Sequence, residues 1–308
     1  MMNRCLLSGL AFLLVLAVSC RKKKLPDTEL HFSGSMIVEG RERTYTVNLP
    51  PNYPEGSGFS LVLALHGGGG SARQFETTSG LSEKANASGF IVVYPEGVRS
   101  SGLLGLRTWN AGGCCDDAAE KNIDDVQFIS RLIDQLVAGY KINPKRVYAT
   151  GHSNGGMMAY RLACQLSHKM AAIAPSAATL VVQQSCQPGR SVPVLHLHSA
   201  VDRHVPFEGG VGSGPSKHYN PPVDSALHVF LRINGCPTIA VETKETSGYT
   251  HKKWSGCSGN AEVQYYLTKD GGHAWAGGSK GSSIGDAPST AISSNDLLWA
   301  FFQQYQLP

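Results

Sequence analysis

The stretch VYATGHSNGGMMAYRLA, residues 147–163, changes character in its middle. It begins with β-branched and aromatic residues, which favour a strand, and it ends in a run that favours a helix. Between the two halves lies GHSNG, residues 151–155. A serine between glycines at a strand–helix junction is typical of a nucleophile elbow, a turn that exposes the hydroxyl of Ser153. A plain strand–helix turn would use the same residue types, so the rest of the sequence must decide between the two interpretations.

The composition is that of a folded globular protein. The 308 residues are 42% hydrophobic and 16% charged, and the mean hydropathy is −0.13, which excludes a disordered chain. The net charge of +4 is matched by the single run Arg21–Lys24. Because no basic face remains elsewhere in the sequence, nucleic-acid binding is not expected.

Residues 1–20 are predicted to be a signal peptide of the bacterial lipoprotein type. Leu6–Val18 is apolar but too short for a comfortable membrane span, and it leads into Cys20. Lipidation of Cys20 would anchor an exported protein to the membrane, in the periplasm or at the cell surface. Ordinary cleavage with secretion, or a retained anchor, are the alternatives. We expect residues 21–32 to form a linker, either near anionic headgroups or solvated, and residues 33–308 to form a single catalytic domain.

Export predicts disulfide bonds. Of eight cysteines, Cys5 lies in the leader and Cys20 is the lipidation candidate. The six that remain are an even number, as expected in an oxidising compartment: Cys114, Cys115, Cys164, Cys186, Cys236 and Cys257. Cys236 and Cys257 bracket a polar segment and are the favoured pair, whereas the pairing of the other four stays open. A metal site at the adjacent Cys114 and Cys115 is disfavoured, because zinc sites commonly place two residues between their cysteines.

Short apolar runs alternate with helical patterns along the remaining sequence. Segment 34–50 alternates apolar and polar residues on both sides of Glu39-Gly40, which predicts a hairpin. Buried strands are predicted within 60–66, 90–97, 146–153, 171–177, 192–200 and 263–272, and helices within 74–88, 122–140, 223–231 and 289–305. This order predicts an α/β fold, with a mostly parallel central sheet, helices on both faces and an N-terminal antiparallel hairpin.

A nucleophilic serine needs a base and an acid, and in nucleophile-elbow enzymes these follow in the order serine, acid, histidine. Asp202 comes directly after a predicted strand, and His273 lies on a glycine-rich loop after the last one. We therefore expect Asp202 to orient His273, which acts as the general base for Ser153. Asp224 is the rival acid, but its place at a helix start suggests capping. His251 lies in a polar insert and is expected at the surface.

The reaction also needs hydrogen-bond donors for a developing oxyanion. The backbone N–H of Asn154, which follows the candidate nucleophile, is one expected donor. The other is expected from Gly68, in the four-glycine loop after an earlier strand. That loop lacks the Lys-Ser/Thr ending of a phosphate-binding loop. Three further histidines, in or beside predicted strands, are expected to pack in the core: His152, His196 and His198.

Six segments in this order resemble the polyhydroxybutyrate depolymerase/feruloyl esterase family, which includes acetylxylan esterases of carbohydrate esterase family 1. They are LHGGGGSA, WNAGGCC, DDVQFI, GHSNGGMMAYRLAC, HSAVDRHVPF and GGHAWAGG, and the resemblance covers about residues 33–305. It implies an α/β-hydrolase fold, an exported serine esterase with Ser153, Asp202 and His273 as its triad, and no metal or organic cofactor. The chain departs from the family's usual residues at four positions that bear on substrate more than on catalysis: Ser199, Ala200, Ala274 and Ala276.

Two tryptophans are expected to contact the substrate. Trp109 lies in the long loop after Gly97, and Trp275 lies two residues after His273. Aromatic rings beside a triad can hold a ferulate ring or a sugar face, although packing beneath the loop is the alternative for Trp109. The expected substrates are feruloyl or acetyl esters of plant polysaccharide, with polyhydroxybutyrate as the alternative. A non-catalytic binding module or a peptidase on the same fold are the competing classes. The sequence leaves the oligomeric state open.

Overall fold

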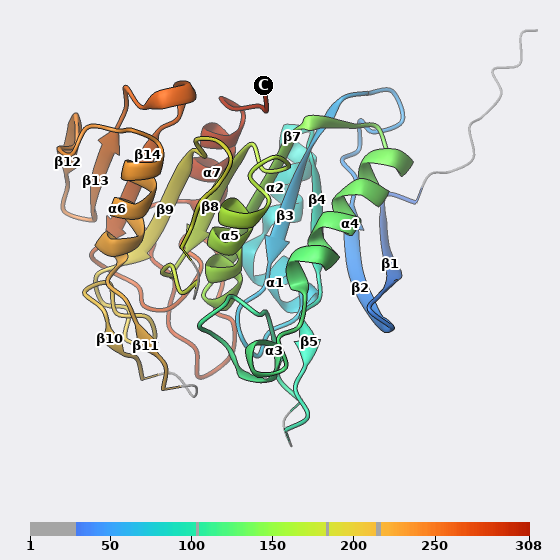
Figure 1. The fold of residues 1–308 in the computed structure, drawn as a ribbon, viewed down its shortest axis with the longest axis horizontal. Helices are drawn as coiled ribbons and strands as arrows, with labels where there is room; N and C mark the ends of the chain where they lie inside the picture. Colours follow the sequence, from blue (N-terminus) through green and yellow to red (C-terminus); the bar gives the residue numbers. More distant parts are fainter. Residues whose placement is uncertain (1–28, 103–104, 183–184, 214–216) are drawn as a thin grey trace, which may run out of the picture.

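The computed structural model describes residues 29–102, 105–182, 185–213 and 217–308 (Figure 1). The predicted signal peptide, Cys20 and most of the expected linker lie outside the described residues. The first strand begins at His31, inside the segment expected to be linker. No helix in the described ranges combines the length and the apolarity that a membrane crossing requires.

A ten-stranded sheet forms the centre of the structure, with strand order β1-β2-β4-β3-β7-β8-β9-β14-β13-β12. Its strands are β1 (His31–Val38), β2 (Arg41–Asn48), β3 (Phe59–Leu65), β4 (Ile91–Pro95), β7 (Ile142–His152), β8 (Ala172–Ser176), β9 (Val194–Ser199), β12 (Glu242–Glu245), β13 (Tyr249–Trp254) and β14 (Val263–Thr268). The strands from β4 to β14 in this order pair in parallel, and those outside them pair antiparallel. The mostly parallel sheet and the N-terminal hairpin of β1 and β2 are as predicted.

The second antiparallel edge was not predicted. The polar segment between Cys236 and Cys257 forms β12 and β13, and the four residues of β12 are all exposed. Their sequence, Glu-Thr-Lys-Glu, has no apolar alternation from which a strand could be recognised. Charged residues are nevertheless suited to an edge strand, because they discourage pairing with another chain.

Helices cover both faces of the sheet, as predicted (Figure 1). One face carries α4 (Asp125–Gly139), α5 (Asn154–Gln165) and α6 (Val223–Ile233), and the other carries α1 (Ala72–Ser79), α2 (Leu81–Ser88) and α7 (Ser294–Phe302). Residues of β3 alternate between the two cores: Leu61, Leu63 and Leu65 join one, and Val62 and Ala64 join the other. Because β3 is buried on both faces, its sequence from Leu61 to Leu65 is a continuous apolar run.

Two helix boundaries differ from expectation. The helix expected over 74–88 is divided into α1 and α2 by Gly80, whose φ of 63° ends one helix and begins the next. Helix α4 begins at Asp125, and its N-cap is Asp124 rather than Asn122, because the Asp124 carboxylate accepts from Gln127 N. Asn122 instead has a positive φ of 46° in the preceding turn.

Short elements gather at the carboxyl ends of the parallel strands, toward the lower edge of Figure 1. They are the small sheets β5 (Val98–Arg99) with β6 (Arg107–Thr108) and β10 (Gly210–Val211) with β11 (Tyr219–Asn220), and the helix α3 (Asp116–Glu120). The 3₁₀ turn η1 (Ser258–Asn260) precedes β14. In open α/β sheets the crevice outside the carboxyl ends of the strands is where ligands bind.

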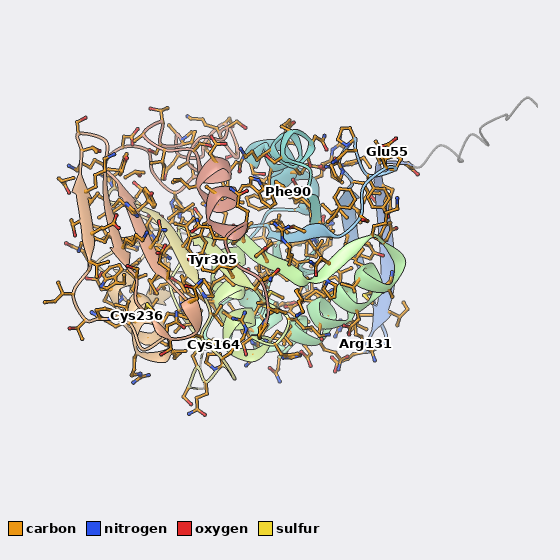
Figure 2. The ribbon with its side chains drawn as sticks, turned by 90° about the horizontal axis from the view of Figure 1, so that it is seen from above. Glu55, Phe90, Arg131, Cys164, Cys236 and Tyr305 are labelled. Atoms are coloured by element: carbon orange, nitrogen blue, oxygen red, sulfur yellow. A yellow bond between two sulfur atoms is a disulfide. The ribbon has the colours of Figure 1, made fainter. Side chains whose placement is uncertain are left out.

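Disulfide bonds are present, as export predicts. Cys236 is joined to Cys257, the favoured pair, and this bond closes the segment that forms β12 and β13. Cys164, at the end of α5, is joined to Cys186 (Figure 2 labels Cys164 and Cys236). The adjacent Cys114 and Cys115 are joined to each other.

Candidate active site

Ser153 occupies the turn between β7 and α5 in a strained backbone conformation. Its φ of 54° and ψ of −122° lie in a region that residues other than glycine rarely adopt. A Cβ atom on Gly151 would lie 2.5 Å from the carbonyl carbon of Gly155, and one on Gly155 would overlap the carbonyl oxygen of Leu65. The glycines therefore let the chain turn tightly against β3. Ser153 is not used as a helix cap, because its hydroxyl makes no capping bond to α5.

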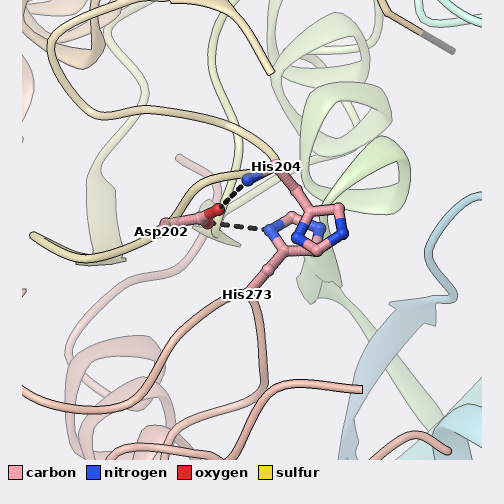
Figure 3. Close-up of side chains that lie close together, drawn as sticks. All are labelled: Asp202, His204 and His273. Carbon is pink, nitrogen blue, oxygen red and sulfur yellow. Dashed lines mark hydrogen bonds and ion pairs between the residues drawn. The ribbon is translucent and has the colours of Figure 1, made fainter. Parts of the chain in front are cut away.

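Asp202 lies in the turn after β9, and its side chain has no exposed surface. Its Oδ1 accepts from the backbone N–H groups of His204 at 2.8 Å and Val205 at 2.9 Å. Its Oδ2 accepts from Nδ1 of His273 at 2.7 Å (Figure 3). Burial alone would raise the pKa of Asp202, but the charge of His273 and these hydrogen bonds lower it to about 2. The carboxylate is therefore ionised in the folded protein. The rival acid, Asp224, lies in the first turn of α6.

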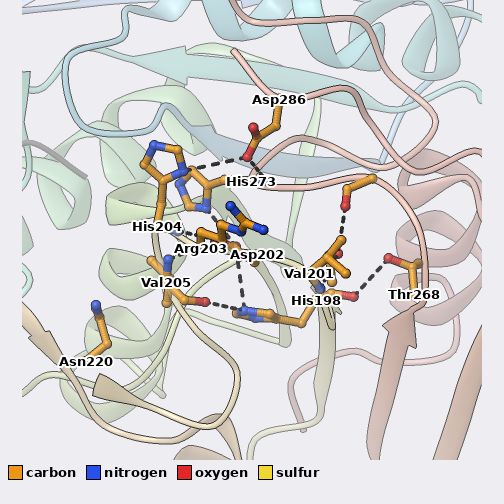
Figure 4. Close-up of polar contacts among 12 residues, drawn as sticks. His198, Val201, Asp202, Arg203, His204, Val205, Asn220, Thr268, His273 and Asp286 are labelled. Carbon is orange, nitrogen blue, oxygen red and sulfur yellow. Dashed lines mark hydrogen bonds and ion pairs between the residues drawn. The ribbon is translucent and has the colours of Figure 1, made fainter. Parts of the chain in front are cut away.

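His273 lies on the loop that follows β14. Its backbone N–H donates to Oδ2 of Asp286 at 2.7 Å, so Asp286 holds the backbone of the loop while Asp202 holds the ring (Figure 4). Because Nδ1 donates to the Asp202 carboxylate, the neutral ring carries its proton there and leaves Nε2 as an acceptor. This tautomer is the one that a general base requires.

Two other histidines flank the ring of His273. The ring centroid of His152 lies 4.7 Å from that of His273, and the centroid of His204 lies 4.8 Å away. Burial, followed by the charge of His273, lowers the pKa of His152 to about 3, so His152 stays neutral. Nδ1 of His204 lies 3.7 Å from Oδ2 of Asp286. His152 was expected to pack in the core, but it contacts the candidate base.

Ser153 and His273 line one open cavity of about 660 Å³. The glycine loop 67–70 forms one wall, and Trp275 contributes to another. A Cβ atom on Gly68 would lie 3.7 Å from Cβ of Asn154, so the two expected oxyanion donors are neighbours. Among the described residues, the N–H groups of Gly68 and Asn154 donate to no other group. Both amides are thus free for a ligand.

The expectation that Trp109 contacts the substrate is wrong. Its side chain is 0% exposed, and its Nε1 donates to the carbonyl oxygen of His66 at 3.0 Å. The Asn154 side chain holds the backbone of Trp109 twice, accepting from its N–H at 2.7 Å and donating to its C=O at 3.0 Å. A buried indole N–H usually finds a hydrogen-bond partner, and here the partner is the carbonyl of His66, which directly precedes the glycine loop 67–70. Trp109 therefore braces the cavity wall from behind.

Trp275 does line the cavity, but with little of its surface. It is 3% exposed, and its Nε1 donates to Oδ1 of Asn295 at 3.0 Å. Its ring packs edge-on against Phe75, with centroids 5.2 Å apart. More accessible side chains complete the rim, and none of these was predicted: Gln74, Thr78, Leu106 and Ile284. They lie on segments without a motif, and only the pairing of distant loops in the fold brings them together.

One group of described side chains has ligand atoms spaced closely enough to consider a metal ion. It consists of Asp202, His204 and His273, whose candidate ligand atoms lie within 4.8 Å of one another. However, the oxygens of Asp202 already accept three N–H groups, including Nδ1–H of His273. The arrangement therefore fits proton transfer better than metal coordination.

The chain is similar to esterases in both sequence and structure. A family model described as "Putative esterase" matches residues 35–203. Feruloyl esterase B from Piromyces equi is 30% identical over 274 residues, which are 86% of this chain and 46% of that protein, so the chain spans about half of this relative. Putative esterase NocK from Nocardia uniformis subsp. tsuyamanensis is 31% identical over 262 residues, 79% of this chain and 73% of that protein. Acetyl xylan esterase from Aspergillus awamori has a similar fold, with a TM-score of 0.62, at 14% identity over 88% of this chain and 99% of that one.

Proposed function

The chain belongs to the esterase family that its sequence matches, and we propose that it is a serine carboxylic-ester hydrolase with Ser153 as nucleophile, His273 as general base and Asp202 as the acid that orients it. The observation that carries this proposal is the shared cavity, in which a strained serine and a histidine with Nδ1 fixed by a buried carboxylate face the same space. No part of the reaction needs a metal or an organic cofactor.

In the proposed reaction, Oγ of Ser153 attacks the ester carbonyl while Nε2 of His273 takes the hydroxyl proton. The Asp202 carboxylate stabilises the imidazolium that forms. When the tetrahedral intermediate collapses, the alcohol leaves with the proton from His273, and an acyl-enzyme remains. Water then attacks the acyl group with His273 again as base, which releases the acid and restores Ser153.

We assign the oxyanion hole to the backbone N–H groups of Gly68 and Asn154. Both are free of protein partners among the described residues, and Asn154 is also the first residue of α5, where the helix dipole favours negative charge. One such donor is typically worth about 2.7–4 kcal/mol of the barrier. Ser153 makes no hydrogen bond to His273 among the described residues, as is common before a substrate binds and tightens the site.

We propose that the substrates are feruloyl or acetyl esters attached to plant polysaccharide. The relative from Piromyces equi is named a feruloyl esterase, which supports this class. The cavity of about 660 Å³ is open, so a polymer chain can reach Ser153 from the side. Its rim offers apolar surface at Leu106 and Ile284 and amide hydrogen-bonding at Gln74. Oligomers of hydroxybutyrate are the second candidate, because the same open cavity admits a polyester.

We further propose that the protein is exported and anchored through Cys20. The apolar run Leu6–Val18 followed by small residues and Cys20 supports this, as does the presence of disulfide bonds. Replacement of Cys20 by Ala should release the protein from the membrane fraction or block its processing. An unchanged membrane fraction with normal processing would assign the anchoring to another feature.

A fluorophosphonate probe tests the catalytic proposal directly, because it labels only an activated serine. The wild-type protein should be labelled at Ser153 and should hydrolyse p-nitrophenyl acetate. Ser153→Ala should lose both properties with an unchanged melting temperature. Ser71 is a matched control, since it lines the same cavity but its Oγ caps α1 by accepting from Gln74 N, and Ser71→Ala should keep the label. A Ser153→Ala variant with more than about a hundredth of wild-type kcat would refute the assignment, because loss of a triad serine costs far more.

A further inference from the structure

A chain of buried polar groups lies behind Asp202, and the proposed reaction does not use it. His196 and His198 alternate along β9, so both rings project from the same face of the sheet. Tyr160 Oη lies 2.8 Å from Nδ1 of His196, and Nε2 of His196 lies 3.1 Å from Nδ1 of His198. Nε2 of His198 in turn lies 2.8 Å from the carbonyl oxygen of Val205 (Figure 4).

The last contact fixes the direction of every hydrogen bond in this chain. The Val205 carbonyl can only accept, so Nε2 of His198 carries a proton. In a neutral ring Nδ1 of His198 then accepts from Nε2–H of His196. Nδ1 of His196 consequently accepts from the hydroxyl of Tyr160. Every polar atom of the two rings is satisfied in this single arrangement, as buried polar groups require.

Both imidazoles are kept neutral by their surroundings. The two residues are 0% and 4% exposed, and burial lowers the pKa of His196 and of His198. Besides His196, the charges that act on His198 are those of Asp202, on the following turn, and of His273, beyond it. On the other strands and helices, His152 from β7, Tyr160 from α5 and Tyr265 from β14 face the pair.

The chain of hydrogen bonds ends on the turn that carries the catalytic acid. The N–H of Val205 donates to Oδ1 of Asp202 at 2.9 Å, while the C=O of Val205 accepts from His198. The C=O of Val205 is therefore held by His198 of strand β9, and the N–H of Val205 holds the Asp202 carboxylate. Nε2 of His198 lies 3.7 Å from Oδ2 of Asp202, which is too far for a hydrogen bond. His198 is therefore linked to Asp202 through Val205.

We propose that His198, as the neutral tautomer that donates from Nε2 to Val205, is a positioning residue that holds the 202–205 turn so that Asp202 stays on Nδ1 of His273. This inference rests on the proposed triad. A residue that only filled the core would contribute to stability without affecting the His273–Asp202 contact. Only the positioning role therefore predicts that replacing His198 changes the pH dependence of the reaction.

Replacing His198 by each of two neutral amides, asparagine and glutamine, distinguishes the positioning role from a role in core packing alone. Glutamine is long enough for its amide N–H to reach the Val205 carbonyl, whereas asparagine is too short. His198→Asn should lower kcat for p-nitrophenyl acetate at least tenfold with KM within about threefold. The Asp202 carboxylate stabilises the imidazolium of His273, so its displacement should move the acid limb of the kcat/KM profile to lower pH. His198→Gln should retain most of kcat and the wild-type profile.

A second measurement does not depend on turnover. The proton on Nδ1 of His273 is shared with a carboxylate and should give a far-downfield NMR resonance, which should be lost or shifted in His198→Asn and kept in His198→Gln. If the wild type shows the resonance but hydrolyses no ester, the proposed function fails while this inference stands. Unchanged kinetics and resonance in His198→Asn, or equal damage in both variants, would overturn it. If His198→Asn does not fold, Tyr160→Phe serves instead, because it removes only the hydroxyl that donates to His196. The inference then requires a smaller shift of the acid limb of the kcat/KM profile, again to lower pH.

Discussion

Nδ1 of His273 lies 2.7 Å from Oδ2 of Asp202, although 71 residues separate the two in the sequence. The contact is made at the carboxyl ends of the adjacent parallel strands β9 and β14. The Asp202 side chain is fully buried, and two backbone N–H groups hold its other oxygen. An ionised carboxylate in that position can fix the tautomer of His273 and compensate the charge that the ring gains during the reaction.

Asp202→Asn should therefore reduce kcat by about 10⁴-fold with a much smaller effect on KM. The amide of asparagine can donate to Nδ1 of His273, which would place the ring proton on Nε2 and remove the base. Initial rates with p-nitrophenyl acetate measure the effect. Asp134→Asn is the control for loss of a carboxylate, because Asp134 is largely exposed and pairs with Lys169 far from the cavity. A kcat for Asp202→Asn within tenfold of wild type would exclude Asp202 as the triad acid.

Trp109→Phe should lower kcat without a matching rise in KM. The substitution keeps the buried ring but removes the N–H donor to the His66 carbonyl, which directly precedes the oxyanion loop. Loss of a buried hydrogen bond of this kind costs about 1–3 kcal/mol of stability. We expect a kcat lowered about tenfold, measured with p-nitrophenyl acetate, and a reduced melting temperature.

Trp254→Phe is the matched control for that change. Trp254 is 7% exposed, and its Nε1 has no hydrogen-bond partner among the described residues. The substitution should therefore leave kcat close to wild type, although the smaller ring leaves a cavity that lowers stability in both variants. If the two variants lowered kcat alike, or if Trp109→Phe raised KM with kcat unchanged, Trp109 would not act by bracing the proposed oxyanion loop.

The stability of the protein should fall as pH decreases from about 6.5 to 4. Burial lowers the pKa of His66 to about 4 and that of His152 to about 3, from 6.5 for the free side chain. In this range the unfolded chain binds protons that the folded chain does not, so stability rises with pH. His66 alone should contribute about 3 kcal/mol across the range. Asp202, with its pKa lowered from 3.8 to about 2, acts only below this window, where its stabilising effect is lost as pH falls through 2.

Urea unfolding at several pH values between 4 and 7.5 measures this dependence. His66→Gln should flatten the slope by about one proton, although it also removes the contact to Gly97 N and lowers stability overall. His228→Gln, at an exposed position on α6, should leave the slope unchanged. A free energy of unfolding that is constant between pH 4 and 6.5 would show that the buried histidines are protonated in the folded state.

The parts of the fold and site that follow from local chemistry could be predicted from the sequence. Continuous apolar runs predicted the parallel strands because such strands are buried on both faces. The GHSNG turn predicted the strained backbone of Ser153, since only glycine fits at 151 and 155. Asp202 and His273 were proposed as the acid and the base because each lies on a loop soon after a predicted strand.

The remainder depends on contacts between distant segments. Asp286 holds the backbone of His273 from a glycine- and serine-rich loop that has no pattern of its own. Trp109 was assigned to the substrate because an aromatic residue in a long loop resembles a binding residue, yet the fold turns it inward against His66. His204, which flanks the ring of His273, was not predicted. The signal that could have pointed to it is its position two residues after the candidate acid.

The side chains at the rim of the cavity should determine which esters the protein prefers. Ile284 is 96% exposed and lines the cavity that contains Ser153, so it offers apolar surface to an aromatic acyl group. We expect kcat/KM for methyl ferulate and acetylated xylan to exceed that for short hydroxybutyrate oligomers, and kcat/KM is the quantity that measures discrimination between substrates. Ile284→Ser should lower kcat/KM for methyl ferulate severalfold and leave p-nitrophenyl acetate nearly unchanged, because acetate is too small to reach the rim. Thr78→Ser, on the same rim, controls for a conservative change. Preference for hydroxybutyrate oligomers over both other esters by more than about tenfold, or about 1.4 kcal/mol in the barrier, would reverse the substrate assignment and leave the proposed roles of Ser153, Asp202 and His273 intact.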